Sequence, residues 1–250
     1  MNEIRLSGVT VAYPVSITTR QRSGFAAAAQ ALSFGKIGSG SDGSQYVVAL
    51  KNLNLQINQG SRVGLIGRNG SGKSTLLKTA AGIVPPRSGE RYVSGTIGCV
   101  LSLGAGMDGE KSGLDNMRMV ARLHGLYGEE LKRAVADAAE FTELGPYLDL
   151  PVRTYSAGMI ARLCFAIATA KQSDVLLIDE VIGAGDAHFI GKAGQRILKL
   201  AEQSNIMLLA SHSYSILKDY CTEVIWMDAG VVKMRGDVDE VWNAYIDTLG

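Results

Sequence analysis

A glycine-rich run between a predicted strand and a predicted helix restricts the possible folds of this chain more than any other feature. Residues 67–74 read Gly-Arg-Asn-Gly-Ser-Gly-Lys-Ser, after a short apolar strand predicted over 62–66 and before a helix predicted over 73–81. Glycines let the backbone N–H groups of such a loop surround a phosphate, and the helix N-terminus adds about half a positive charge. The sequence therefore predicts a P-loop in an α/β nucleoside-triphosphatase fold.

The residues of this loop have separate expected roles. Lys73 is expected to reach the β- and γ-phosphates, and Ser74 to bind Mg²⁺. We expect Lys73 to be a surface residue that packs against little, so that it matters for binding and catalysis and barely for stability. The expected nucleotide contacts are Gly67, Arg68, Asn69, Gly70, Ser71, Gly72, Lys73, Ser74 and Thr75.

Two adjacent carboxylates follow a second apolar strand. The strand is predicted over 175–178, and Asp179 and Glu180 come directly after it. A strand buried in a parallel sheet presents the residue at its carboxyl end to the ligand edge of that sheet. Asp179 is expected to hold Mg²⁺ through water, and Glu180 to orient or deprotonate the attacking water. The alternative is a carboxylate pair that only caps a helix.

A serine precedes the most apolar helix of the sequence. Ser156 stands before a helix predicted to run to about residue 170, and Gly158 lies in its first turn. Serine is a favourable N-cap, which is a sufficient structural reason for its presence. The functional alternative is that this helix N-terminus points at a phosphate, with Ser156 and Gly158 in close contact with it.

Composition excludes several classes of protein. The 250 residues are 46% hydrophobic, which is too apolar for a disordered chain. Lys+Arg 25 against Asp+Glu 24 leaves a net charge of +1, so no overall field attracts nucleic acid or an anionic membrane. No apolar run approaches the roughly 20 residues of a spanning helix, and we expect no secretory signal. Free buried thiols, rather than a zinc site, are expected at Cys99, Cys164 and Cys221.

The order of predicted elements indicates an α/β core interrupted by helices at about 105–170. Helical spacing is present over 114–123 and 131–144, whereas strands are predicted before and after this region. The predicted strands cover 4–13, 46–57, 62–66, 175–178, 206–210, 224–227 and 231–234. Further helices are predicted near 190–203 and over 238–249, and Asp228-Ala-Gly230 predicts a tight hairpin turn.

A polar, Gly/Ser-rich stretch at 16–45 contains an apolar island at 25–34. Phe25, Ala28, Ala29 and Leu32 would share one face of a helix there. Such a short helix needs a partner to pack against, so we favour a gating or docking role over a passive loop.

These motifs in this order resemble the ATP-binding subunit of an ABC transporter. Ser156 lies 23 residues before Asp179, where that family carries its L-S-G-G-Q signature, and Ser156 and Gly158 match two of its positions. The resemblance implies that Ser156 and Gly158 contact ATP, that residues 183–186 form a D-loop with Asp186 at the nucleotide, and that His212 is the switch histidine. It also implies that Tyr13 stacks on adenine, although a tyrosine at a strand end can equally be a core residue.

The resemblance extends to the subfamily that exports O-antigen, capsule and related polysaccharides. Its Y-S-S-G-M signature is similar to Tyr155-Ser-Ala-Gly-Met159, and residues 103–107 and 113–116 also match. The implied fold is a single cassette over 1–250. It has a RecA-like core at about 1–104 and 171–250, an antiparallel β subdomain and a helical subdomain at about 105–170. We expect no C-terminal carbohydrate-binding domain, because the core strands end by about residue 234.

One position departs from the family pattern. ABC ATPases usually carry a glutamine that contacts Mg²⁺ at the end of the strand after the P-loop helix, but no glutamine occurs between Lys73 and Ser156. The register of residues 97–102 places Ser102 there, so either Ser102 contacts Mg²⁺ or a water takes that place.

The resemblance implies a subunit that hydrolyses ATP with Mg²⁺ to drive export of a polysaccharide or lipid-linked glycan. A separate membrane permease would form the pathway, and the chain would sit peripherally at the cytoplasmic face of the cell membrane. Two copies would pair head to tail with ATP between them, binding neither nucleic acid nor the glycan directly. The alternatives are the ATPase of an importer or drug exporter, a non-transport ABC ATPase acting on DNA or ribosomes, and a nucleotide-binding regulator without turnover.

Overall fold

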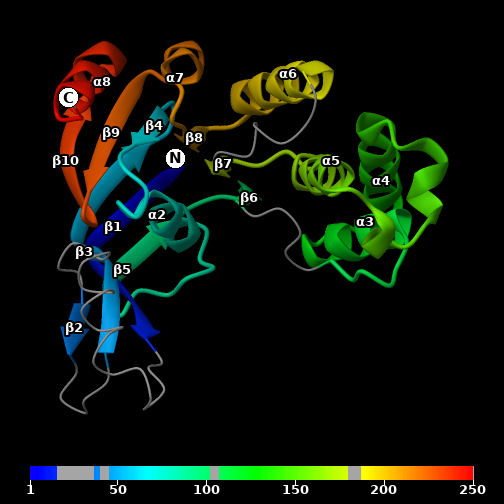
Figure 1. Cartoon of the computed structure of the whole chain (residues 1–250), viewed down its shortest axis with the longest axis horizontal. Helices are drawn as coiled ribbons and strands as arrows, with labels where there is room; N and C mark the ends of the chain where they lie inside the picture. The colour runs from blue at the N-terminus through cyan, green and yellow to red at the C-terminus, as the bar shows by residue number, and fades with distance from the viewer. Residues whose placement is uncertain (16–36, 40–44, 102–106, 180–186, 250) are drawn as a thin grey trace. The chain divides into compact units, whose positions relative to one another are not determined.

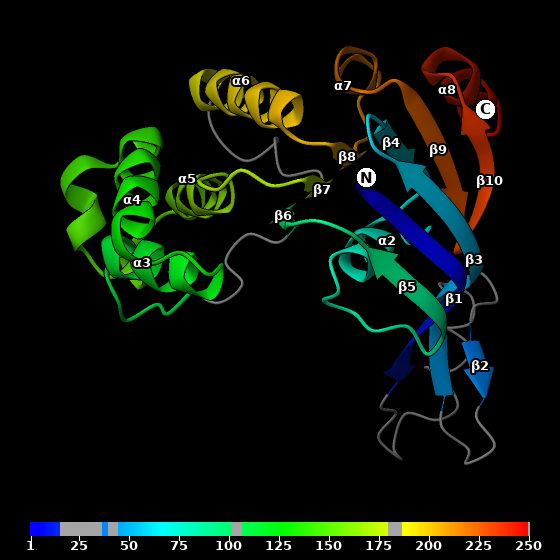
Figure 2. The same cartoon turned by 180° about the vertical axis from the view of Figure 1, so that it is seen from behind.

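The computed structural model describes residues 1–15, 37–39, 45–101, 107–179 and 187–249. The chain forms two compact units. The first joins Met1–Gly95 to Leu208–Gly250, and the second is Thr96–Met207. Figure 1 and Figure 2 show the helices and strands of both units from opposite sides. The helical region expected at 105–170 falls inside the second unit.

The first unit contains the expected antiparallel sheet, with strand order β2-β3-β1-β5. β1 and β3 pair in a register that places Ile4 opposite Ile57 and Leu6 opposite Leu55, and all four side chains are buried. This alternation explains why both strands were predictable. The strands are β1 (Glu3–Val15), β2 (Ile37–Ser39), β3 (Gln45–Asn58) and β5 (Ser88–Val93).

Strand β2 lies in the Gly/Ser-rich stretch at 16–45, where the sequence predicted no strand. Its three residues, Ile37–Ser39, pair antiparallel with Val47 to Gln45 of β3. A three-residue strand containing glycine has no detectable alternation, so the sequence gives no sign of it. The apolar island at 25–34 and its expected helix lie outside the described residues.

In the first unit, the strand that leads into the P-loop pairs with a strand that belongs to a β-hairpin. β4 (Arg62–Ile66) pairs in parallel with β9 (Glu223–Asp228), and β9 turns back into β10 (Val231–Gly236). The turn residues Ala229 and Gly230 have φ values of 47° and 84°, as a two-residue hairpin turn requires. The predicted hairpin is therefore confirmed.

Two helices after β8 (Ile206–Ala210) cover this part of the first unit. α7 (Tyr214–Tyr220), which the sequence analysis did not predict, packs so closely on β4 that a Cβ at Gly64 would lie 2.6 Å from Leu217 Cδ2. α8 (Val238–Asp247) packs on β9, where the rings of Tyr245 and Trp226 are 5.6 Å apart. Glycine at position 64 thus lets Leu217 of α7 lie close to β4.

The second unit contains two parallel strands and most of the helices. β6 (Ile97–Val100) pairs with β7 (Val175–Asp179) so that Ile97 lies opposite Val175. The α-helices of this unit are α3 (Gly113–Leu123), α4 (Gly128–Thr142), α5 (Ala157–Ala168) and α6 (Ala187–Gln203), joined in part by the 3-10 helices η2 (Gly145–Asp149) and η3 (Val152–Thr154).

α4 differs most from its predicted limits of 131–144. It begins three residues earlier, where Glu129 and Glu130 place negative charge in the first turn. It ends two residues earlier, because Glu143 adopts a left-handed conformation with φ 56°. Apolar spacing alone includes Leu144, which is buried although it lies beyond the helix.

Three features of the described residues bear on the expectations from composition. No helix there is long and apolar enough to cross a membrane, and no cluster of His, Cys, Asp or Glu there has the geometry of a metal site. Cys164 and Cys221 are buried and form no disulfide, and burial raises the pKa of Cys221 to about 12. Cys99 is only partly buried.

Candidate functional site

The glycine-rich loop after β4 folds so tightly that two of its glycines are sterically required. Gly67 has φ 141°, and a Cβ there would lie 2.2 Å from the carbonyl oxygen of Met227 on β9. Gly72 has φ 110°, and a Cβ there would lie 2.7 Å from the carbonyl oxygen of Ala49 on β3. Since L side chains rarely adopt such values of φ, both the conformation and the space select glycine.

Lys73 is buried in this loop, which corrects the expectation of a surface residue. Its side chain is 7% exposed, and its ammonium donates hydrogen bonds to the carbonyl oxygens of Gly67 (2.6 Å) and Arg68 (3.3 Å). The lysine is therefore held inside the curve of its own loop, with its charge facing the backbone that would surround a phosphate. Lys73 contributes to the shape of the loop as well as to its charge.

Ser71 is the residue that points most directly to an anion in this loop. Its side chain is 4% exposed, and its hydroxyl has no hydrogen-bond partner among the described residues. A buried hydroxyl without a partner costs about 1–3 kcal/mol, which a phosphate oxygen accepting its hydrogen bond would recover. The donors and the space of the loop thus fit a phosphate group.

α2 (Lys73–Ala80) begins inside the loop, and its first turn faces solvent at Ser74. Tyr13 from β1 lies beside this turn, with its hydroxyl 3.5 Å from Thr75 Oγ1. The Tyr13 side chain is 39% exposed, so it is not the core tyrosine of the alternative interpretation. Arg68, Asn69 and Gly70 are exposed at the tip of the loop.

The hairpin turn between β9 and β10 braces the loop, a role that the sequence analysis missed. The N–H of Gly230 donates to the carbonyl oxygen of Ser71 at 2.9 Å, and its own carbonyl accepts from Lys51 N–H at 3.0 Å. A Cβ at Gly230 would lie 2.6 Å from the carbonyl oxygen of Ala49. Asp228-Ala-Gly230 signals a turn in the sequence, but nothing there shows which loop the turn supports.

His212 leaves β8 next to the strand that leads into the loop. The N–H of Ser211 donates to the carbonyl oxygen of Leu65 at 3.3 Å, two residues before Gly67. The next residue, His212, is exposed. The structure therefore places His212 in the first unit with the loop, as the family resemblance implies, while its switch role stays a prediction.

Ser156 is the N-cap of α5, as its sequence context predicts. Its hydroxyl accepts a hydrogen bond from the N–H of Met159 at 3.2 Å. A Cβ added at Gly158 would meet only Ser156 Oγ, at 3.9 Å. No packing among the described residues demands glycine at position 158, so the first turn of α5 offers open space to a ligand or partner.

The other expected site residues belong to the second unit. Asp179 is the last residue of β7 and is partly exposed, after a strand whose residues 175–178 are all buried. Glu180, Asp186 and Ser102 lie outside the described residues. Their expected roles stay predictions.

Comparison with known proteins identifies the family of this chain. A family model described as ABC transporter matches residues 50–183, more than half of the chain. RfbE of Yersinia enterocolitica, an O-antigen export system ATP-binding protein, is 40% identical over 93% of this chain and 97% of its own length.

The chain belongs to the ABC transporter family.

Further matches agree with this membership. RfbB of Myxococcus xanthus, also an O-antigen export system ATP-binding protein, is 39% identical over 81% of this chain. The match covers 46% of RfbB, so this chain spans about half the length of that relative. A dimeric structure of the ATP-binding cassette MJ0796 bound to ADP and phosphate aligns with a TM-score of 0.71 at 21% identity, covering 94% of this chain and 98% of MJ0796. The predicted ABC cassette fold and ATPase class are thus confirmed, as is the likeness to the O-antigen export type.

Proposed function

We propose that this ABC ATPase powers export of an O-antigen-type polysaccharide or lipid-linked glycan through a separate membrane permease. The observation that carries the proposal is the match to RfbE, which is an O-antigen export system ATP-binding protein and aligns over nearly the whole of both chains. RfbB carries the same description. These matches favour polysaccharide export over the importer, drug-exporter and non-transport alternatives.

ATP with Mg²⁺ is the proposed ligand of the loop. The buried hydroxyl of Ser71 would donate to a phosphate oxygen, and Lys73 would exchange its two carbonyl partners for oxygens of the β- and γ-phosphates. Mg²⁺, when bound, would neutralise charge on these phosphates. Ser74 and Asp179 would hold it, with Ser102 as a further candidate.

The remaining residues would position the adenine ring, the attacking water and the γ-phosphate. Tyr13, exposed beside the first turn of α2, would stack on adenine. Glu180 would accept a proton from the attacking water, and His212 would donate to the γ-phosphate. Such contacts act by holding charges and reacting atoms in place, which is the main contribution of a protein to phosphoryl transfer.

The N-terminus of α5 would complete the site of a second copy of this chain. Ser156 and Gly158 stand in an open first turn, where the helix dipole favours an anion. The dimeric cassette MJ0796 has the same fold. In the proposed head-to-tail pair, ATP would lie between the P-loop of one copy and α5 of the other, so that nucleotide state controls separation of the two copies.

The proposed partners follow from the description of the relatives as parts of an export system. The chain would bind a polytopic permease at the cytoplasmic face of the cell membrane, and the permease would handle the glycan. The net charge of +1 offers no attraction for nucleic acid, which disfavours the DNA- and ribosome-associated alternatives.

Removal of this chain from its bacterial host tests the proposal. The host should lose surface polysaccharide while lipid-linked glycan accumulates inside, as measured by blotting of surface and cytoplasmic fractions. A plasmid copy of the natural chain should restore surface display, whereas a Lys73→Ala copy expressed at the same level should not. Unchanged surface polysaccharide after deletion would contradict the export function.

A further inference from the structure

Glu143, just beyond the end of α4, occupies a strained backbone position where its carboxylate meets two other helices. Its φ of 56° and ψ of 24° are left-handed values that residues other than glycine and asparagine seldom adopt. Glycine, which tolerates this conformation, follows only two residues later at position 145. The strain at Glu143 therefore needs a compensating contribution from its side chain.

That contribution comes from basic side chains on both α5 and α6. Lys192 of α6 donates to Glu143 Oε1 at 2.7 Å, His188 Nδ1 of α6 lies 3.7 Å from Oε2, and Arg162 Nη1 of α5 lies 4.0 Å from Oε2. The side chains of Arg162 and Lys192 are 19% and 31% exposed, so their charges are partly shielded from solvent. One carboxylate thus joins three helices, and these charges hold the pKa of Glu143 below its ordinary value, with the Lys192 hydrogen bond as the largest cause.

The same cations also bind the end of α4 through its backbone. Lys192 Nζ donates to the carbonyl oxygen of Phe141 at 3.1 Å, and Arg162 Nη1 donates to that of Thr142 at 3.4 Å. Positive charge at a helix C-terminus interacts favourably with the helix dipole. α5 and α6 are therefore tied to one point, the C-terminus of α4.

Aromatic packing beneath these charges fixes the angle at which the helices meet. Phe141, Phe165 and Phe189 come one from each of α4, α5 and α6, and their ring centroids are 5.5 to 6.0 Å apart. Arg162 lies 5.0 Å from the ring centroid of Phe189, and Lys192 lies 4.9 Å from that of Phe141. At this junction the three phenylalanine rings pack together, and Arg162 and Lys192 lie against two of them. Both cations also pair with the Glu143 carboxylate.

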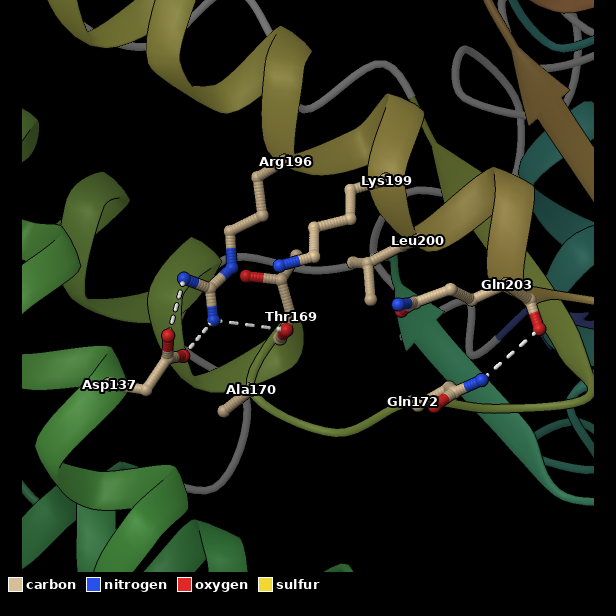
Figure 3. A pocket seen from close by; sticks show the side chains of 8 residues that line it. All are labelled: Asp137, Thr169, Ala170, Gln172, Arg196, Lys199, Leu200 and Gln203. Carbon is tan, nitrogen blue, oxygen red and sulfur yellow. Dashed lines mark hydrogen bonds and ion pairs between the residues drawn. The ribbon is translucent and has the colours of Figure 1, made fainter.

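A second ion pair nearby provides a comparison. Arg196 of α6 pairs with Asp137 of α4 and donates to the carbonyl oxygen of Thr169 at 3.1 Å, beside a cavity of about 260 Å³ (Figure 3). This pair joins α4 to α6, as Glu143 does. It has no charged partner on α5, since Thr169 lies just after that helix and contributes only its carbonyl.

One of the helices joined by Glu143 carries the dimer-facing residues of the proposed ATP site. α5 begins directly after Ser156, and Gly158 lies in its first turn. We propose that Glu143 is a positioning residue that keeps α5 in a fixed relation to α4 and α6, so that Ser156 and Gly158 can meet a second copy of the chain around ATP. This inference rests on the proposed function, and Glu143 itself is not expected to touch nucleotide.

The test compares Glu143→Gln with Asp137→Asn, because each variant removes one carboxylate charge that pairs with a cation of α6. Both are made in a Glu180→Gln background that retains ATP, and dimerisation is measured by sedimentation with and without ATP and Mg²⁺. Glu143→Gln should raise the dissociation constant of the ATP-bound dimer by about three- to tenfold, as expected for a partly shielded charge network. ATP affinity of the monomer should stay within twofold, because the P-loop is untouched.

ATP turnover without the background substitution supplies a second measurement. Glu143→Gln should lose turnover at low protein concentration and regain it at high concentration, which a purely structural defect would not do. Asp137→Asn should leave the dimer constant unchanged. Wild-type dimerisation by Glu143→Gln, or equal weakening by both variants, would overturn the positioning role.

A third variant guards against a folding failure. Glu143→Asn should accept the left-handed backbone, yet its shorter side chain cannot reach Lys192, so it should weaken the dimer as Glu143→Gln does. If it folds and dimerises normally, the proposal fails. Failure of the natural chain to dimerise or hydrolyse ATP would instead count against the proposed function, so the two failures are distinguishable.

Discussion

The ammonium nitrogen of Lys73 lies 2.6 Å from the carbonyl oxygen of Gly67, the first residue of the loop that Lys73 closes. The lysine therefore holds its loop in the curve that would receive phosphate before any ligand is present. Because its side chain is only 7% exposed, loss of the charge removes both an internal support and the expected phosphate contact.

Lys73→Ala should raise the dissociation constant for ATP at least about 30-fold, since removal of one partner of a buried charged hydrogen bond costs about 2–5 kcal/mol. Titration calorimetry with ATP and Mg²⁺ measures this change. Without ATP, the free energy of unfolding should fall by about 1 kcal/mol, because the carbonyls of Gly67 and Arg68 lose a donor. Wild-type affinity for ATP in this variant would refute the assignment of the loop.

Ser156 and Ser112 allow the effect of helix capping to be separated from a role in the ATP site within the second unit. Each is an N-cap whose hydroxyl accepts from the N–H three residues later, at the start of α5 and α3 respectively. Ser156→Ala and Ser112→Ala should each lower the free energy of unfolding by about 0.5–2 kcal/mol. Only Ser156→Ala should also weaken the ATP-bound dimer and reduce ATP turnover. If both variants lowered ATP turnover equally, Ser156 would act only as a helix cap and would have no separate role in the ATP site.

Gly230→Ala tests whether the β9–β10 turn supports the P-loop. The variant forces a Cβ to within 2.6 Å of the Ala49 carbonyl oxygen and disturbs the N–H bond to Ser71. Gly60→Ala is the matched control, because Gly60 has a similar φ of 91° and no atom within 4 Å of an added Cβ. Left-handed strain should cost each variant about 1–2 kcal/mol of stability. Only Gly230→Ala should also weaken ATP binding, and normal binding by a folded Gly230→Ala chain would exclude the bracing role.

Asp174 should make the stability of the second unit depend on pH. Its carboxylate accepts hydrogen bonds from the N–H and hydroxyl of Thr96, both at 2.8 Å, and from the Asn205 amide at 3.0 Å. These bonds, the Thr96 N–H first, lower the pKa of Asp174 in the folded chain. The stabilisation that the Asp174 carboxylate provides is therefore complete above its pKa of about 3.9 in the unfolded chain. It is lost as pH falls through the lower pKa of Asp174 in the folded chain.

Asp174→Asn should accordingly be less stable than the natural chain at pH 7. The difference in free energy of unfolding should shrink as pH falls below about 4, where the natural carboxylate takes up a proton. Denaturant titrations at fixed ionic strength across this range measure it. A difference that stays constant with pH would show that Asp174 acts through shape rather than charge.

Contiguous patterns made much of the fold predictable. The strands 62–66 and 206–210 have the predicted limits, because each is a buried apolar run. The edge strand β5 and the seven-residue helix α7 were not predicted, since β5 is largely polar and α7 buries only Leu217. The periodicity of apolar residues reflects which residues are buried, so an element that buries few residues is hard to predict from it.

The candidate site shows the same limit. The P-loop residues are consecutive and carry their own signature, so their positions were predictable. The bonds from Lys73 to the carbonyl oxygens of its own loop appear only once the loop is folded. The support from Gly230 joins segments far apart in the chain, which no local pattern encodes. The meeting of Arg162 and Lys192 at Glu143 likewise arises only when α4, α5 and α6 pack together.

ATP-driven glycan transport in everted membrane vesicles tests most directly whether hydrolysis by this chain powers export. Vesicles from the native host would carry either the natural chain or Glu180→Gln, and lipid-linked glycan in the lumen would be measured by its protection from added glycosidase. The natural chain should protect glycan with ATP but not with a non-hydrolysable analogue. Glu180→Gln should bind ATP yet lose about 10²–10⁴ in turnover, with protection falling in parallel. Equal protection without ATP, or with the Glu180→Gln chain, would contradict export powered by ATP hydrolysis.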